Sequence, residues 1–185
     1  AWYAESYPER PAAELPIGDA ESKWDFEQLT TYLESDAGKF GDPDMGREIF
    51  VKANCASCHR SGGLGEAIGP DLTQIARRFT KREVLESILF PSHVISDQYM
   101  SRRVLTLDGK VYVGLVSDSG NGQITIRNSA NEVVTLNSDD IDQLHVSSSS
   151  IMPSNSLDSL SLKEISDLMA YMGVLPPIEV AKRPK

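Results

Sequence analysis

The sequence is poor in cysteine and histidine, with two and three residues among 185. It also has fewer basic than acidic side chains, 18 against 27, which gives a formal net charge of −9 and argues against a nucleic-acid partner. No apolar run approaches the roughly 18 residues of a membrane span. The segment beginning at Ala1 lacks the basic and apolar regions of a signal peptide. With 40% hydrophobic residues, the chain is long enough for one full core and a smaller module.

Both cysteines lie in one short motif, Cys55-Ala56-Ser57-Cys58-His59. This C-x-x-C-H spacing is typical of covalent haem c attachment. Two thiols three positions apart can add to the two vinyl groups on one porphyrin edge, and the adjacent imidazole can then ligate the iron. The sequence therefore predicts one haem c, tethered by Cys55 and Cys58, with His59 as the proximal ligand.

The haem has consequences for location and partners. Haem is attached to thiols outside the bacterial cytoplasm, so we expect a periplasmic or otherwise extracytoplasmic protein, represented here by a processed or excised piece. Two haem propionates would add to the negative charge of the chain. We therefore expect a partner to dock through a cationic surface.

Three other uses of the cysteines agree less well with the sequence. A zinc site needs about four Cys or His ligands, and only His93 and His145 remain outside the motif. A thioredoxin-like dithiol would follow a strand, whereas a helical segment precedes this motif and a glycine-rich one follows it. The third alternative is a pair of buried structural thiols.

Five segments have the apolar spacing or the capping residues of helices. They are Trp24 to Leu33; the segment after Asp42-Pro43, with the stripe Met45, Ile49, Phe50 and Ala53; a short helix with Leu72, Ile75, Ala76 and Phe79; Thr80 to Leu89; and Ser161 to Met172. Capping boxes open the last two helices. Residues 1 to 20 contain three prolines and predict an extended arm.

Between these helices, the apolar period changes to two. Val104 to Leu107 and Val111 to Leu115 flank Asp108-Gly109, a strong hairpin signal. A turn is expected over Ser117 to Gly122, and further short strands over 124–126, 133–136 and 141–146. Strands that follow one another in sequence predict a small antiparallel meander, curled or barrel-like.

A methionine opposite the histidine would favour the ferrous state of the iron. Met45, Met169 and Met172 lie on helical stripes, where packing explains them, and Met100 lies at the start of the first strand. Met152 lies in a non-helical stretch that Pro153 stiffens, and we expect it to be the distal ligand. His93, His145 and an open or water-ligated site are the alternatives.

These residues resemble class I cytochromes c. The resemblance rests on the helix with Gly46 and Phe50, the haem motif, Gly69-Pro70-Asp71-Leu72, Met152-Pro153 and the last helix with Leu168 and Tyr171. It implies that the Pro70 carbonyl accepts a hydrogen bond from His59 and that the first and last helices cross. We further expect Leu72 and Ile151 to wall the haem pocket, and Arg77 or Arg78 to meet a propionate.

The gap between His59 and Met152 departs from that family, because the strand-rich segment lengthens it. Together with Ile88-Leu89-Phe90-Pro91-Ser92, Asp108-Gly109 and Asp167 to Tyr171, it is similar to the planctomycete and verrucomicrobial type of putative haem-binding domain. This narrower resemblance covers roughly residues 42 to 173. It implies the C-terminal part of a larger secreted protein that resembles sugar dehydrogenases.

The expected fold class is α+β, a mainly α cytochrome c fold interrupted by a small inserted antiparallel β module. The expected divisions are residues 1–41, an arm and a covering helix; 42–98, the first part of the cytochrome domain; 99–146, the β module; 147–175, the second part with the distal methionine; and 176–185, a tail.

The expected function is electron transfer by a monohaem cytochrome, as acceptor or relay for a fused or separate dehydrogenase, with no substrate of its own. A haem enzyme or gas sensor with a displaceable distal ligand is one alternative. The other is an interaction module in which the β insert binds a partner. A simple shield over the haem edge is an equally acceptable role for the insert.

Overall fold

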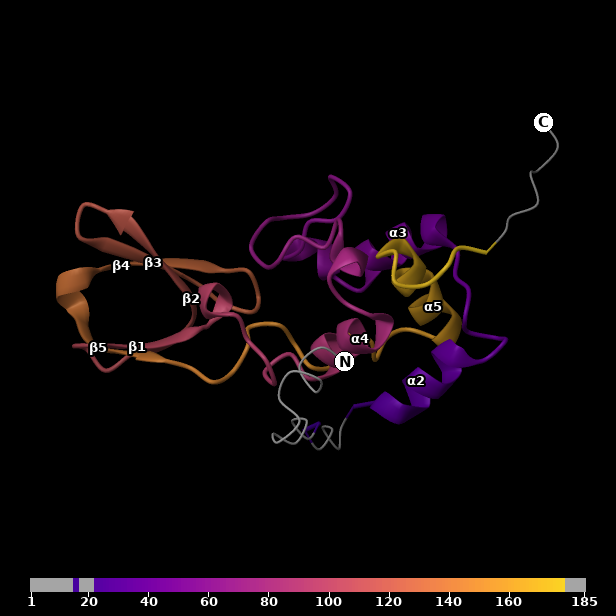
Figure 1. Cartoon of the computed structure of the whole chain (residues 1–185). Helices are drawn as coiled ribbons and strands as arrows, with labels where there is room; N and C mark the ends of the chain where they lie inside the picture. Colours follow the sequence, from indigo (N-terminus) through magenta and orange to yellow (C-terminus); the bar gives the residue numbers. More distant parts are fainter. Residues whose placement is uncertain (1–14, 17–21, 179–185) are drawn as a thin grey trace.

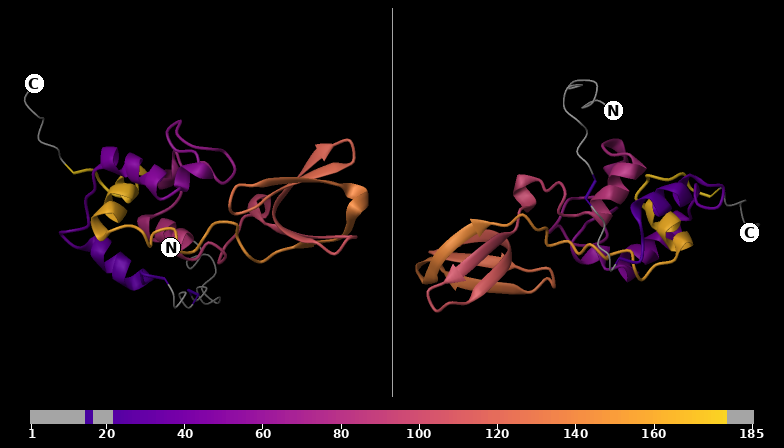
Figure 2. Two further views of the ribbon diagram at one scale, coloured as in Figure 1. Left: turned by 180° about the vertical axis from the view of Figure 1, so that it is seen from behind. Right: turned by 90° about the horizontal axis from the view of Figure 1, so that it is seen from below.

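The computed structural model describes residues 15–16 and 22–178, which form a helical part and a separate β module (Figure 1). Views from behind and from below show the same two bodies joined by two chain segments (Figure 2). The arm expected for residues 1 to 20 lies almost wholly outside the described residues, as does most of the tail. No helix in the described ranges is long and apolar enough to cross a bilayer.

Within the described residues, four α-helices form the helical part, and their starts follow the capping residues of the sequence. They are α2 (Phe26–Glu34), α3 (Pro43–Lys52), α4 (Lys81–Leu89) and α5 (Leu162–Tyr171). Asp25 and Asp42 cap α2 and α3, each carboxylate accepting two backbone N–H bonds. Thr80 and Ser161 open α4 and α5 with complete capping boxes. These helices are confirmed close to their expected bounds.

Helices α3 and α5 cross in close contact. A Cβ atom added at Gly46 would lie 2.0 Å from the backbone oxygen of Asp167 on α5. The rings of Phe50 and Tyr171 pack at the same crossing, with centroids 5.4 Å apart. The buried Asp167 carboxylate accepts the Asp42 backbone N–H at 2.7 Å, which joins the start of α3 to α5. The crossing of first and last helices is therefore confirmed.

The close approach at Gly46 predicts a large effect of any side chain there. We expect Gly46→Val to lower the free energy of unfolding by about 3 kcal/mol, because the added methyls must push α5 away. Met45→Val on the same helix is the matched control, since Met45 is 48% exposed. Thermal or urea unfolding of the two variants measures the difference. Equal free energies of unfolding in the two variants would show that α3 and α5 can move apart without loss of stability.

The helical core lies between α2, α3, α4 and α5. Its fully buried members include Leu29, Leu33, Phe50, Leu85 and Leu168. The segment before α5 is tied to α2 by the indole N–H of Trp24, which donates to the Leu157 carbonyl at 3.0 Å. The chain on both sides of the β module therefore builds one helical core.

The β module is a single curled antiparallel sheet. Its strands are β1 (Arg102–Thr106), β2 (Val111–Gly120), β3 (Gln123–Arg127), β4 (Val133–Asn137) and β5 (Ile141–Val146), in the order β4-β3-β2-β1-β5. The first half of β2 pairs with β1 and its second half with β3, so one long strand serves both sides of the curl. Val104 and Ile126 are buried on the inner face. The expected barrel-like meander is confirmed.

Three local expectations were wrong. The segment Leu72 to Phe79 makes only one 3-10 turn, η2 (Ile75–Arg77), in which the N–H groups of Ile75, Arg77 and Arg78 donate to carbonyls three residues back. Strand β2 continues to Gly120 through the expected turn, and the Ser117 and Thr125 hydroxyls pair across the strands at 2.7 Å. Met45 is exposed, because Gly46 takes the contact position on α3.

Hydrogen bonds at two places define how the β module joins the helical part. Its ends meet, since the Ser147 N–H donates to the Ser101 carbonyl at 2.9 Å and the Ser101 hydroxyl donates to the Ser149 carbonyl at 2.6 Å. Its β3–β4 turn reaches back to the helical part, where the Asn131 amide donates to the Ser57 carbonyl at 3.4 Å. The module is thus anchored at its base and at one turn.

Candidate functional site

The C-x-x-C-H motif follows α3 directly. Asn54 turns the chain with a positive φ of 61°, and the 3-10 turn η1 (Cys55–Ser57) comes next. The N–H groups of Cys58 and His59 both donate to the Cys55 carbonyl, at 3.2 and 2.9 Å. One tight turn therefore separates the two thiols. They are half-buried and form no disulfide, and burial raises the pKa of Cys55 to about 11.

The imidazole of His59 is oriented by the Pro70 carbonyl, which lies 2.9 Å from its Nδ1 atom. A carbonyl oxygen can only accept, so Nδ1 carries the proton and Nε2 keeps its lone pair. Burial lowers the pKa of His59, partly offset by the bond to Pro70. A neutral ring with a free Nε2 has the form required of an iron ligand.

Glycines let the chain fold tightly around this ring. A Cβ atom at Gly69 would lie 2.7 Å from Cε1 of His59. Gly65 has a φ of +90°, and a Cβ there would lie 2.2 Å from the His59 carbonyl oxygen. The N–H groups of Ile68 and Gly69 donate to the Cys58 carbonyl at 3.0 and 2.8 Å. The loop after the motif therefore wraps the histidine closely.

A cavity of about 470 Å³ lies beside this loop. Its lining consists of Pro70, Asp71, Leu72, Thr73, Gln74, Ile75, Arg78 and Phe79. Three of the expected site residues, Pro70, Leu72 and Arg78, therefore share one cavity wall, whereas Arg77 is not part of it. The Arg78 guanidinium carbon lies 5.5 Å from the centre of the Phe79 ring.

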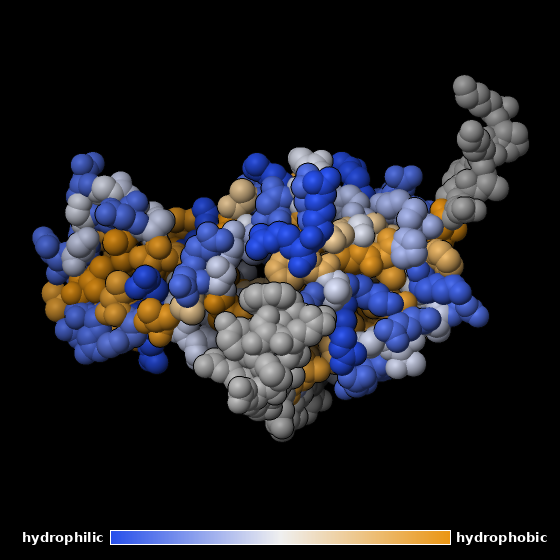
Figure 3. Space-filling model, in the orientation of Figure 1, coloured by the Kyte–Doolittle hydropathy of each residue, from blue (hydrophilic) through white to orange (hydrophobic). Residues whose placement is uncertain are grey.

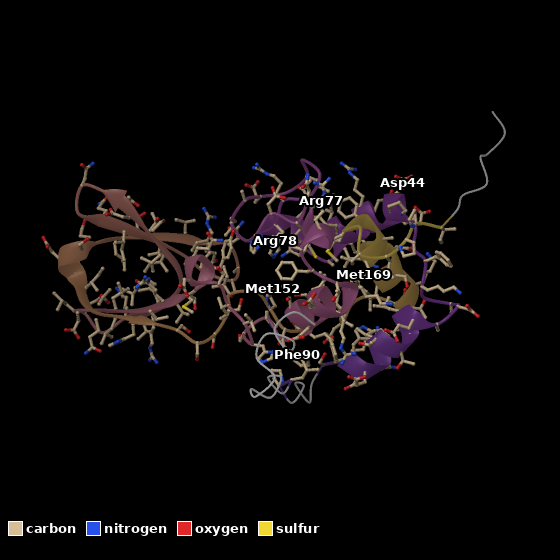
Figure 4. All side chains as sticks on the ribbon, in the orientation of Figure 1. Asp44, Arg77, Arg78, Phe90, Met152 and Met169 are labelled. Atoms are coloured by element: carbon tan, nitrogen blue, oxygen red, sulfur yellow. The ribbon has the colours of Figure 1, made fainter. Side chains whose placement is uncertain are left out.

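The loop with Met152 is held by two serines. The Met152 N–H donates to the Ser150 hydroxyl at 3.1 Å, and the Ser150 N–H donates to the Ser92 hydroxyl at 2.9 Å. Ser92 follows α4, so this helix fixes the start of the loop. Met152 and Ile151 are both half-buried. Figure 4 shows Arg78 and Met152 in the middle of the molecule, between the helical part and the β module.

The other candidate ligands have different surroundings. Met169 and Met172 are buried in the helical core, 1% and 6% exposed. His93 pairs with Glu86 at 3.0 Å, and the His145 ring bonds to Gln143 on β5 at 3.1 Å. In the described part of the chain, no contact joins Met152 to His59. Ligation by Met152 therefore stays a prediction.

The residues around the motif fit a haem group. Two free thiols lie one turn apart, and a neutral imidazole presents Nε2. The adjoining cavity has four apolar residues, Arg78, Asp71 and two uncharged polar residues in its lining, whereas Ile151, Met152 and the residues of the motif are not part of it. Among the described residues, no group of three or more His, Cys, Asp or Glu side chains could hold a metal ion on its own. The chemistry available to these residues is therefore that of a tethered porphyrin.

Residues 44–99 match the family model for cytochrome c. The matched segment contains α3, the motif, the Pro70 loop and α4, and it ends where the β module begins. The chain thus has a cytochrome c domain over these residues, and haem c is implied, with Cys55 and Cys58 spaced for covalent attachment. A search of curated proteins found no match.

Several site contacts were missed in the sequence. The packing of Gly69 against His59, the bond from Asn131 to Ser57 and the two serines behind Met152 all join residues distant from one another in the chain. A fourth is the Tyr171 hydroxyl, which donates to the Ser61 carbonyl at 2.9 Å and ties α5 to the loop after the motif. Only Gly69 had a local signal, because Gly69-Pro70-Asp71 has the composition of a turn.

Proposed function

We propose that this chain is an extracytoplasmic monohaem cytochrome that relays electrons for a fused or separate dehydrogenase. The observation that supports this best is the state of His59. Its Nδ1 proton is engaged by Pro70 and its Nε2 atom is free, within one turn of two unpaired thiols. When bound, the haem would supply one-electron chemistry, and the protein would supply its ligands and surroundings.

The remaining site residues take supporting roles in this proposal. Cys55 and Cys58 would tether the haem, Leu72 and Ile151 would wall its pocket, Arg78 would meet a propionate, and Met152 would be the distal ligand. A haem closed on both sides exchanges electrons but leaves no position for a substrate, which favours a relay over an enzyme.

The cytochrome c match supports electron transfer in general, and such domains are typically carriers outside the cytoplasm. The dehydrogenase partner and the planctomycete and verrucomicrobial type rest on the resemblance of the sequence. The proposed divisions of the domain at residues 98 and 147 are supported by the position of the strands, which run from Arg102 to Val146.

Spectroscopy of the holoprotein tests the relay. We expect denaturing mass spectrometry to show one added haem, and the absorption spectrum of the ferrous form to stay unchanged under carbon monoxide. A thioether occupying the sixth position blocks the gas, whereas a vacant site binds it. A carbon monoxide complex in the native protein would overturn the relay in favour of a gas sensor or haem enzyme. A colourless protein would contradict the assignment of haem as the cofactor.

A further inference from the structure

The outer face of the β module differs in the sign of its charged side chains from the chain as a whole, which is acidic. In an antiparallel sheet, residues that pair directly share a face. The buried inner face is marked by Val104, Gly114 and Ile126, so the alternate positions point outward. These outward positions are Arg103, Leu105, Val111, Val113, Leu115, Ser117, Gln123, Thr125, Arg127, Val133, Thr135, Asn137, Gln143 and His145.

No carboxylate occupies any of these outward positions, although the whole chain has 27 acidic residues. Their charged members are Arg103 and Arg127, and His145 pairs directly with Arg103. The six acidic residues of the module lie in turns, in the η4 turn (Ser138–Asp140) or at inward-phase strand positions. The charged side chains at these outward strand positions are therefore all basic.

Val113 and Leu115 on β2 lie between these cations, since they pair with Arg103 and Arg127, and Val111 and Val133 extend the apolar surface beyond them. Val113 pairs with Arg103 and is 46% exposed, and Val111, the next outward residue on β2, is 47% exposed. Val133 on β4 is 49% exposed and pairs with Arg127. In Figure 3 the apolar side chains of the β module are seen mainly between its upper and lower strands, on the inner side of the curl and not on this outer face. An apolar centre with a charged border is the composition of a protein-docking surface.

This face also leads toward the haem motif. The Arg127 guanidinium donates to the Asn131 side-chain oxygen at 2.5 Å, and the Asn131 amide donates to the Ser57 carbonyl at 3.4 Å. Ser57 lies between Cys55 and Cys58, so it would lie beside the edge of a porphyrin tethered by these two thiols. A protein held on the outer face near Arg127 is therefore held beside the edge through which electrons would pass.

We propose that the outer face of β1, β2 and β3 docks a redox partner whose own surface has an apolar centre and a border of carboxylates. This rests on the proposed electron-transfer function and specifies the partner's chemistry. Net charge alone favours a cationic partner, but at 0.15 M salt charges separated by more than about 8 Å are largely screened. The local arginines then determine which surface binds.

The test uses the holoprotein and a plant-type [2Fe–2S] ferredoxin as the acidic probe, with mitochondrial cytochrome c as the basic probe. At 0.15 M salt we expect the ferredoxin to bind more tightly and to reduce the ferric haem in stopped flow. Arg103→Glu should lower the second-order rate about tenfold, since reversal of a border charge acts mainly on association. Val113→Ser should lower it severalfold.

Arg47→Glu is the matched control, because Arg47 is exposed on α3 and the change in net charge is the same. An equal loss in this variant, or tighter binding of the basic probe, would overturn the proposal. A dimer seen by ultracentrifugation and removed by Val113→Ser would assign the face to a second copy instead, and also overturn it. Failure of the haem to be reduced by dithionite would count against the proposed function, while calorimetric binding of the ferredoxin would still test the face.

Discussion

Met152→Ala is expected to give a haem that binds carbon monoxide and has a reduction potential lower by about 0.2 V. The thioether favours ferrous iron, and axial ligands shift haem potentials over about 0.8 V in all. The ferric variant should also lose the weak red-end absorption band of sulfur bound to iron. Redox titration and absorption spectra of both oxidation states measure the change.

Two variants make this result specific. Met100→Ala should leave the band and the potential unchanged, because Met100 follows the η3 turn (Asp97–Tyr99) outside the Met152 loop. Ser150→Ala should keep the band but weaken it, because the Ser150 hydroxyl accepts the Met152 N–H at 3.1 Å. Loss of the band in Met100→Ala, with retention in Met152→Ala, would show that the distal ligand was misassigned.

The helices could be predicted because their signals are local. Asp25, Asp42, Thr80 and Ser161 cap their helices through bonds to N–H groups two or three residues ahead. Apolar spacing predicted the buried stripe of α5 in the same way. The turn Asp108-Gly109 likewise positioned the first hairpin, since Gly109 takes a positive φ of 82°.

The failures came from tertiary contacts. The Leu72 segment has helical spacing, yet it forms only a 3-10 turn, and the Leu72 N–H holds its start against the Arg60 carbonyl. Met45 continues an apolar stripe in sequence, yet α3 faces α5 through Gly46. The pattern of a single segment contains no information on which surface its neighbour will cover.

In the candidate site, too, features with a local sequence signal were predicted and those made by tertiary contacts were not. The thiols and imidazole occupy five consecutive residues, so their spacing alone indicates the cofactor. The Pro70 carbonyl was expected from the family resemblance, and the structure has it 2.9 Å from His59 Nδ1. The bond between Asn131 and Ser57 joins residues 74 positions apart, and no local pattern predicts it.

The β module is attached to the helical part at its base, near Ser101 and Ser147, and at the turn with Asn131, so we expect that it can be removed as a unit. Ser101 and Ser147 are hydrogen-bonded backbone neighbours, so a very short link can replace the whole sheet between them. The helical core is built by residues on both sides of this junction, including Phe50 and Leu168. Both thiols and His59 precede the module in sequence.

Replacement of residues 102–146 by Gly-Gly is therefore expected to leave covalent haem at the native stoichiometry. The vinyl edge beside Ser57 would lose the cover of Asn131, so reduction by a small neutral reagent should become severalfold faster. Ferredoxin should lose its advantage over the basic probe, because the outer face of the module is gone. Haem content, the red-end band and stopped-flow rates of the matured variant provide the measurements.

Asn131→Ala is the matched control for this deletion, since it removes the contact with Ser57 while the sheet remains. It should speed reduction by the small reagent but keep the preference for ferredoxin. A deletion variant that is soluble yet lacks covalent haem would show that the strands belong to the cytochrome core. In that case the bond from Asn131 to Ser57 would be needed to hold the turn with Cys55 and Cys58 in the conformation that accepts haem.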